Sequence, residues 1–286
     1  MSYNKVMANV LPRSKQLAVL GALVEGNSIR STERMLGVHR DTVMRLGAKI
    51  GEGCSALLDE MMVDLPCKRL ELDELWAFVG KKQRHITAMD GIDKGDTWTF
   101  VAIDAETKLV PMFMTGKRDA AAARAFIQGL AARLTNRVQV TTDGLRTYIE
   151  PIAEAFGTSG VDYAQLHKTY EAEPTGPGRY SPPKVTGTDK TPIFGFPIED
   201  LVSTSYVERQ NLTMRMSIRR FTRLTNAHSK KFENHVAAVA LHFAHYNLAR
   251  VHSSLRVTPA MAAGVTNTVW GMGELLDAAL ARTEEA

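Results

Sequence analysis

Apolar residues recur at helical spacing in three short segments near the start of the chain, which predicts a helical amino-terminal unit. The segments are 14–24, 28–36 and 38–50. Ser28 is placed to cap the second helix, and Gly37 suits the tight turn that follows it. Residues 1–12 have the character of a loose arm. A helix, a short turn with glycine and a further helix form a helix-turn-helix. We therefore expect an all-α, DNA-binding domain over residues 1–52.

The exposed side of the third predicted helix would carry basic and polar side chains. Such side chains can reach base edges and phosphates in a major groove. An ordinary three-helix bundle with a solvated basic face would show the same pattern. The residues expected on this side are His39, Arg40, Thr42, Arg45 and Lys49.

From residue 68 onward the pattern changes to the alternation that is typical of strands. Pro111 places the third predicted strand at an edge, because proline cannot donate a hydrogen bond to a neighbour. Three strands followed by α-β-α-β-α predict a ribonuclease-H-like α/β domain with a mixed five-stranded sheet, over residues 68–226. The predicted strands are 68–79, 97–102, 109–115, 137–142 and 161–166, and the predicted helices are 119–134, 148–156 (broken by Pro151) and 203–223.

The remaining segments connect or follow these units. Residues 53–67 read as a connector with a helical piece inside it, and 173–197 as a loop rich in proline and glycine. A helical region is expected over 227–286. Its predicted helices are 230–252, a short one capped by Thr258 and Pro259, and 269–282.

Composition narrows the classes of protein that fit. The chain has 286 residues, 44% hydrophobic and 23% charged, which suits one large or two smaller globular domains with a real core. The two cysteines, Cys54 and Cys67, form no CxxC pair, so neither a zinc site nor a disulfide framework is indicated. No signal peptide or apolar run of membrane-spanning length occurs, so we expect a reduced, soluble, intracellular protein.

Charge is distributed unevenly along the chain. The net charge is +4 and the pI is about 9.0, which favours a polyanionic partner. Residues 209–256 hold nine Lys and Arg and one acid, and 1–70 hold ten and seven, whereas 71–208 hold fifteen and nineteen. Basic ends therefore flank an acidic middle, as a cation-dependent nuclease would require, although solvated surface charge would give the same counts.

Three acids stand out by their positions. Asp73 lies inside the first predicted strand, Asp143 ends the fourth, and Glu208 is in the helix 203–223. Strands disfavour acids, so such acids need a reason. Three converging carboxylates would repel one another unless cations neutralise them, and such a cluster typically holds two Mg²⁺ (or Mn²⁺) ions about 3.5–4 Å apart. Three rival acids are Glu71, on the face of Asp73, Glu74, on the opposite face, and Asp104, at a turn.

The helix 203–223, entered through Ser203 or Ser205, carries a polar stripe. At about 100° per residue, one carboxylate, one amide and two guanidinium groups share its face. A simple helix salt bridge from Glu208 to Arg215 or Arg209 would also explain the acid. The stripe consists of Glu208, Asn211, Arg215 and Arg219.

Longer motifs point to a known family. The segments LELDELWAF, TTDGLRTY, DYAQLHKTY, STSYVERQNLTMRMSIRRFTRLTNAHSKK and HYNLARVHSSLRVTPAMAAG resemble bacterial insertion-sequence transposases of the DDE superfamily, in the group related to insertion sequence One. The resemblance covers roughly residues 15–265. Many relatives carry an amino-terminal zinc ribbon, whose cysteines this chain does not have.

This resemblance implies particular roles. Asp73, Asp143 and Glu208 would form the catalytic, metal-binding triad, with two Mg²⁺ (or Mn²⁺) ions in each active site. The residues that place DNA near the metals would be Arg209, Asn211 and Arg215, and His252 and Arg256 match the tail that follows the glutamate in related integrases.

The function implied is that of a transposase that binds the terminal inverted repeats of its element, cleaves there, and joins the end to target DNA. It would act as a homo-oligomer, at least a dimer, because two DNA ends are handled together. A DNA-binding regulator without catalysis, or a nuclease of the same fold that does not join strands, are the alternatives.

Overall fold

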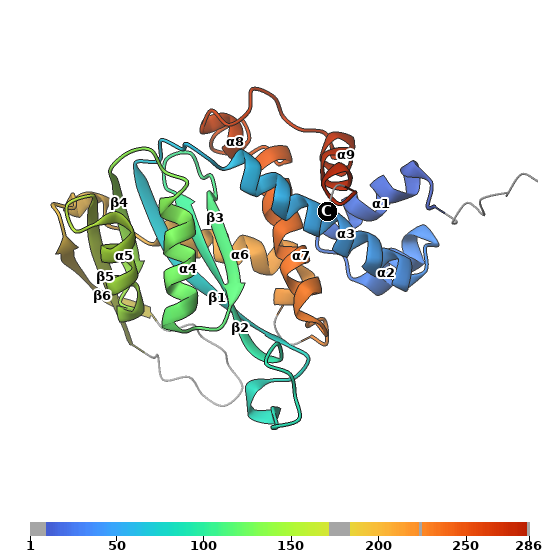
Figure 1. Ribbon diagram of the computed structural model, residues 1–286, viewed down its shortest axis with the longest axis horizontal. Coiled ribbons are helices and arrows are strands. Elements are labelled where there is room, and N and C mark those ends of the chain that lie inside the picture. The colour runs from blue at the N-terminus through green and yellow to red at the C-terminus, as the bar shows by residue number, and fades with distance from the viewer. Residues whose placement is uncertain (1–9, 172–183, 223–224, 285–286) are drawn as a thin grey trace, which may run out of the picture.

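The computed structural model describes residues 10–171, 184–222 and 225–284, and three helices open the chain (Figure 1). They are α1 (Arg13–Val24), α2 (Ile29–Leu36) and α3 (Arg40–Met61). Ser28 caps α2 by accepting a hydrogen bond from the Ser31 N–H, and Gly37 ends it with a φ of 63°. Most of the expected arm lies outside the described residues. The helices 14–24 and 28–36 are thus confirmed, while a DNA-binding role for this unit stays a prediction.

Helix α3 is longer than expected, because it runs through the glycines at which we expected it to end. A Cβ added at Gly51 would lie 2.1 Å from the carbonyl oxygen of Ala237, and one at Gly53 would lie 1.9 Å from that of Ala279. These glycines therefore allow two other helices to pack directly against α3. The expected helix end at Ile50 was wrong, and the division into domains stays a prediction.

The sheet has six strands in the order β3-β2-β1-β4-β5-β6 (Figure 1). The first three strands form an antiparallel meander, β4 pairs parallel with both β1 and β5, and β6 is antiparallel to β5. Strand β3 lies at one edge, as Pro111 predicted. The strands are β1 (Arg69–Val79), β2 (Gly95–Asp104), β3 (Met112–Gly116), β4 (Val138–Asp143), β5 (Val161–Glu171) and β6 (Lys184–Phe194).

Strand β6 corrects the expected five-stranded sheet. It lies inside the segment 173–197 that we expected to be a loop, of which 173–183 fall outside the described residues. Its residues are exposed or half-buried, so it lacks the apolar alternation that marks a strand. Pro192 and two lysines suit an edge strand, where they prevent pairing with another chain.

Helices cover both faces of the sheet (Figure 1). Helices α4 (Ala120–Ala131) and α5 (Ile149–Phe156) lie on one face, and α6 (Ser205–Ser217) packs against β1 and β2 on the other. Asp119 caps α4. Pro151 does not break α5, because it sits in the first turn, where the missing N–H has no helical partner to lose.

The polar helix predicted over 203–223 is shorter in the structure. Helix α6 begins after Thr204 and ends at Ser217, because Ile218 is extended, and Arg219–Phe221 form a separate 3-10 turn. Arg219 therefore leaves the helical stripe.

The carboxy-terminal helices are α7 (Phe232–Ala244), a π-helical turn (His245–Ala249), α8 (Pro259–Ala262) and α9 (Met272–Arg282). The helix predicted over 230–252 therefore ends at Ala249. Thr258 caps α8 through the Met261 N–H, as expected. One buried apolar cluster joins α3, the sheet, α7 and α9. Among the described residues, no helix is long and apolar enough to cross a membrane.

Candidate active site

Asp73 and Asp143 meet because their strands are neighbours. Leu72 pairs with Thr142 in the parallel register of β1 and β4, so the acids that follow lie side by side. Asp73 accepts hydrogen bonds from the Asn211 amide (Nδ2 to Oδ2, 2.7 Å) and from the Glu74 N–H (2.8 Å). Asp143 ends β4 and accepts from the Leu145 N–H (3.0 Å). The expected pairing of the first and fourth strands is therefore confirmed.

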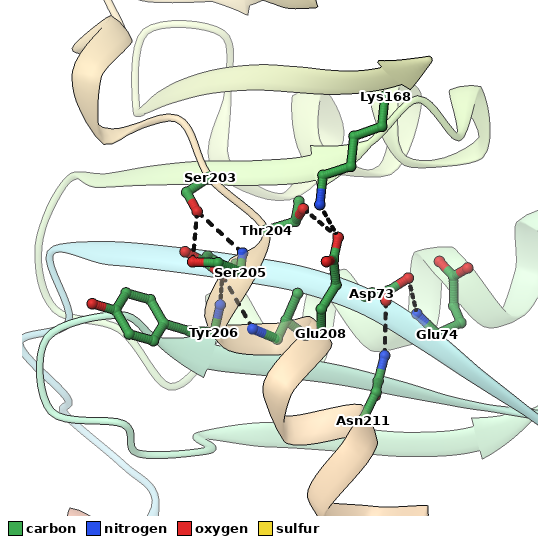
Figure 2. A network of polar contacts seen from close by, with 11 residues as sticks. Asp73, Glu74, Lys168, Ser203, Thr204, Ser205, Tyr206, Glu208 and Asn211 are labelled. Atoms are coloured by element: carbon green, nitrogen blue, oxygen red, sulfur yellow. Dashed lines mark hydrogen bonds and ion pairs between the residues drawn. The ribbon is translucent and has the colours of Figure 1, made fainter. Parts of the chain in front are cut away.

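Glu208 reaches the same region from the first turn of α6. Its carboxylate accepts hydrogen bonds from the Lys168 ammonium of β5 and from the Thr204 hydroxyl (2.8 Å), and the contacts are drawn in Figure 2. The Glu208 side chain is 47% exposed and that of Lys168 only 18%. Glu208 therefore pairs with a lysine of a neighbouring strand.

A cavity of about 470 Å³ opens between these elements. Asp73, Asp143 and Glu208 all line it, so the fold brings the three acids together from β1, β4 and α6. The pKa of Asp73 is raised to about 7, mainly by burial. The hydrogen bond from the Glu74 N–H opposes this rise, and the charges of Glu74, Asp143 and Glu208 contribute to it. The acids thus form one electrostatic cluster.

The side chains are not gathered into a closed ligand set. Among the described residues, no three His, Cys, Asp or Glu side chains lie close enough together to hold a metal ion. Hydrogen bonds occupy the oxygens of Asp73, while Lys168 holds Glu208. A shared cation would require the Glu208 side chain to turn from Lys168 toward the aspartates.

The rival acids have other partners. Glu71 Oε2 accepts the N–H groups of Tyr206 (2.7 Å) and Val207 (3.1 Å), so a buried strand residue caps α6. This cap corrects the expectation that Ser203 or Ser205 would serve. Burial raises the pKa of Glu71 above its ordinary value, and the two backbone hydrogen bonds oppose that rise.

Glu74 and Asp104 also serve the fold. Glu74 lies on the opposite face, as expected, where Arg118 pairs with it at 3.1 Å. Asp104 accepts hydrogen bonds from the Thr107 N–H (3.1 Å) and the Thr107 hydroxyl (2.6 Å) in the turn after β2.

The residues expected to face DNA on α3 do not share one side. Arg40 lines a groove between the amino-terminal helices and α7, whereas Arg45 and Lys49 follow at angles of about 140° and 180° around the helix. Thr42 is half-buried, and Lys49 pairs with Glu284 at 3.6 Å. Arg45 and Lys49 thus lie on one side of α3 and Arg40 on another, and a role for these residues in DNA binding stays a prediction.

Of the residues expected around Glu208, some contact the site and others do not. Asn211 is buried and touches the site through Asp73, while Arg209 is exposed and Arg215 half-buried. His252 and Arg256 lie in the turn after the π-helical segment, where the His252 N–H donates to Val257, and neither lines the cavity.

Sequence reasoning missed two cavity residues of β5. Lys168 pairs with Glu208, and the His167 ring lies so close to Gly144 that an added Cβ would come within 2.4 Å of Nδ1. The glycine after Asp143 thus makes room for an imidazole. Both residues stand in the segment DYAQLHKTY, whose apolar part gave the strand but whose polar end gave no local signal.

One part of the chain matches a known protein family. Residues 92–173 match a family model described as a DDE domain, of the IS240 type of transposase. The match covers less than a third of the chain and includes Asp143, but neither Asp73 nor Glu208. The group related to insertion sequence One is not singled out by this match.

Two solved structures with some likeness are Mos1 complexes. The Mos1 strand transfer complex is 16% identical with a TM-score of 0.24, and covers 55% of this chain and 59% of that chain. The Mos1 paired-end complex with the left transposon end is 16% identical with a TM-score of 0.21, over 51% and 58%. The chain thus spans less than two thirds of these structures. No curated protein matches it.

Proposed function

We propose that this protein is a DDE-type DNA transposase, with a ribonuclease-H-like catalytic domain over residues 68–226. One observation carries the proposal: Asp73, Asp143 and Glu208 line a single cavity although they come from three separate elements. Clustered carboxylates on neighbouring strands are costly to the fold and are typical of cation-dependent phosphoryl transfer. The DDE domain match over 92–173 supports the same class.

The donor set fits a divalent cation. All three acids offer hard oxygen ligands, and repulsion among them helps to raise the pKa of Asp73, which a bound cation would offset. Asp73, Asp143 and Glu208 would hold Mg²⁺ or Mn²⁺, two ions per site. When bound, these ions activate a water or 3′-hydroxyl and stabilise the leaving oxygen.

Neighbouring side chains hold the acids in place. Asn211 fixes one oxygen of Asp73, Thr204 binds Glu208, and the Glu71 cap ties the start of α6 to β1. Lys168 places an ammonium group at the wall of the cavity, where it could donate a charge-assisted hydrogen bond to a DNA phosphate.

The DNA partner would be the inverted repeats of the element and then target DNA. In this proposal residues 1–52 form the helix-turn-helix domain, 53–67 a connector and 227–286 a helical region. Arg45 and Thr42 would read bases or phosphates, and Arg209, Arg215 and Arg219 would place the strand. Two DNA ends imply at least a dimer.

The test uses a plasmid carrying the inverted repeats that flank the gene, incubated with Mg²⁺ or Mn²⁺. Asp143→Asn should abolish cleavage while binding to end DNA stays within a few-fold, because only a metal ligand is lost. Asp162→Asn is the matched control, since Asp162 pairs with Arg137 away from the cavity. Joined products identify a transposase, nicks alone a nuclease, and an active Asp143→Asn protein would remove Asp143 from the site.

A further inference from the structure

A second and larger cavity lies between the amino-terminal helices and the end of α6. It has a volume of about 840 Å³ and is lined by α2, α3 and α7 together with the segment that follows α6. We call it the basic groove. The elements that form it are labelled in Figure 1.

The groove is cationic on both sides. Among the described residues that line it there is no Asp or Glu. Cations repel one another at close range, so a wall without acids favours a polyanion. Its cations are Arg30, Arg40, Arg219, Arg220 and Lys230.

Arg220 is a shielded cation with a neutral hydrogen-bond partner. Burial lowers its pKa, and its hydrogen bond goes to the neutral hydroxyl of Ser229 (3.0 Å). No carboxylate of the described residues lies within ion-pair distance of Arg220, Arg30 or Arg219. A shielded guanidinium is costly without a charged partner, and its planar donors suit a phosphate.

The groove and the active-site cavity are lined by opposite ends of α6. Glu208 and Ser217 are nine residues apart on α6, or about 14 Å along the helix axis, which equals about four base pairs of duplex. The turn at Gly26 packs on the end of α6, where an added Cβ would lie 3.0 Å from the Met216 carbonyl oxygen. The amino-terminal unit is thus seated against the helix that carries Glu208.

We infer that the basic groove binds the phosphodiester backbone of a DNA duplex about four base pairs from the scissile phosphate. This rests on the proposed function for the identity of the scissile site, but the binding itself does not depend on catalysis. Cations on both sides contact successive phosphates, and contacts to phosphates carry no sequence information. Binding here is therefore independent of sequence.

The test measures the affinity for a labelled duplex of arbitrary sequence, about 30 base pairs long, between about 50 and 200 mM salt. Arg30→Gln and Arg219→Gln remove exposed cations that the fold does not need, and Arg220→Gln removes the shielded one. Each should weaken binding about threefold and reduce the salt slope by about 1. Arg124→Gln is the control, because Arg124 lies on α4, on the other face of the sheet, and pairs with Glu154.

Wild-type affinity and slope in Arg30→Gln and Arg219→Gln would overturn the inference, even if the wild type cleaves DNA. If the groove variants weaken DNA binding but the wild type shows no Mg²⁺-dependent cleavage, the result would support DNA binding by the groove and contradict the proposed function. Inorganic pyrophosphate is a second probe. Pyrophosphate could raise the melting temperature of the wild type but not of Arg220→Gln, while Arg220→Gln binds the duplex as tightly as the wild type does. In that case the groove is a small-anion site and the DNA assignment fails.

Discussion

Asp73 should make the metal-free protein less stable as the pH rises, and Asp73→Asn should remove that effect. Burial is the main reason that the pKa of this carboxyl lies near 7, and the charges of Glu74, Asp143 and Glu208 add to it. Raising a pKa from 3.8 to about 7 corresponds to about 4 kcal/mol of unfavourable free energy for the ionised form.

The sign follows from proton binding. Between pH 4 and 7 the native protein holds a proton on Asp73 that the unfolded chain has lost, so stability falls across this window and stays low above it. Asparagine has no charge, but its amide accepts only one of the two hydrogen bonds that Asp73 accepts, which costs about 1 kcal/mol. The variant should therefore be about 2–3 kcal/mol more stable than the wild type at pH 8 and about 1 kcal/mol less stable at pH 4.

Urea unfolding from pH 4 to 8 in the presence of a chelator measures this difference. Asp162→Asn is a control of opposite sign, because Arg137 lowers the pKa of Asp162, and its stabilisation is lost as the pH falls. Added Mn²⁺ should stabilise the wild type more than Asp73→Asn at pH 8. Stability curves of wild type and Asp73→Asn that run parallel across the range would show that Asp73 is not shielded among other acids.

Three further changes test the surroundings of the site. Glu71→Ala should weaken Mn²⁺ binding, measured by calorimetry, several-fold more than Glu74→Ala, because only Glu71 caps α6; equal losses would assign Glu71 to general stability. Lys168→Met should raise the Mn²⁺ affinity about fivefold, since no ammonium then competes for Glu208, and an unchanged affinity would contradict this. Gly51→Ala should cost about 1–3 kcal/mol in urea unfolding, whereas Gly21→Ala, with open space at its Cβ, should stabilise by up to about 1 kcal/mol; similar effects would refute the close contact.

Local signals predicted most of the elements. Ser28 and Thr258 accept the capping hydrogen bonds that their positions suggested, and Gly37 ends a helix with positive φ. These outcomes depend only on neighbours in sequence. The end of α3 depends on a contact that is distant in sequence. Locally, Gly51 indicates a helix break, but in the fold it allows another helix to pack closely against α3. Strand β6 was missed for a related reason, since an exposed edge strand has no buried face to pattern its sequence.

The part of the site that could be predicted from the sequence is the pair of acids that lie in strands. Asp73 and Asp143 are conspicuous in strand positions, and the parallel pairing of β1 and β4 brings them together. The roles of Glu71 and Lys168 depend on contacts across 135 and 40 residues of sequence. The spacing of residues along the chain does not predict such long-range contacts, so these roles can be recognised only in the folded structure.

The acids of β1 explain which part of the site can adapt. Glu71, Asp73 and Glu74 lie within four residues of a central strand, and each has a different partner: the start of α6, Asn211 and Arg118. Two of these contacts join β1 to α6, so Asp73 and the helix that carries Glu208 are fixed relative to each other. The carboxylate of Glu208 is instead held by side chains alone, one of them a flexible lysine. A cation entering the cavity would therefore meet a fixed Asp73 and a movable Glu208, and its affinity would depend on how firmly Lys168 holds that glutamate.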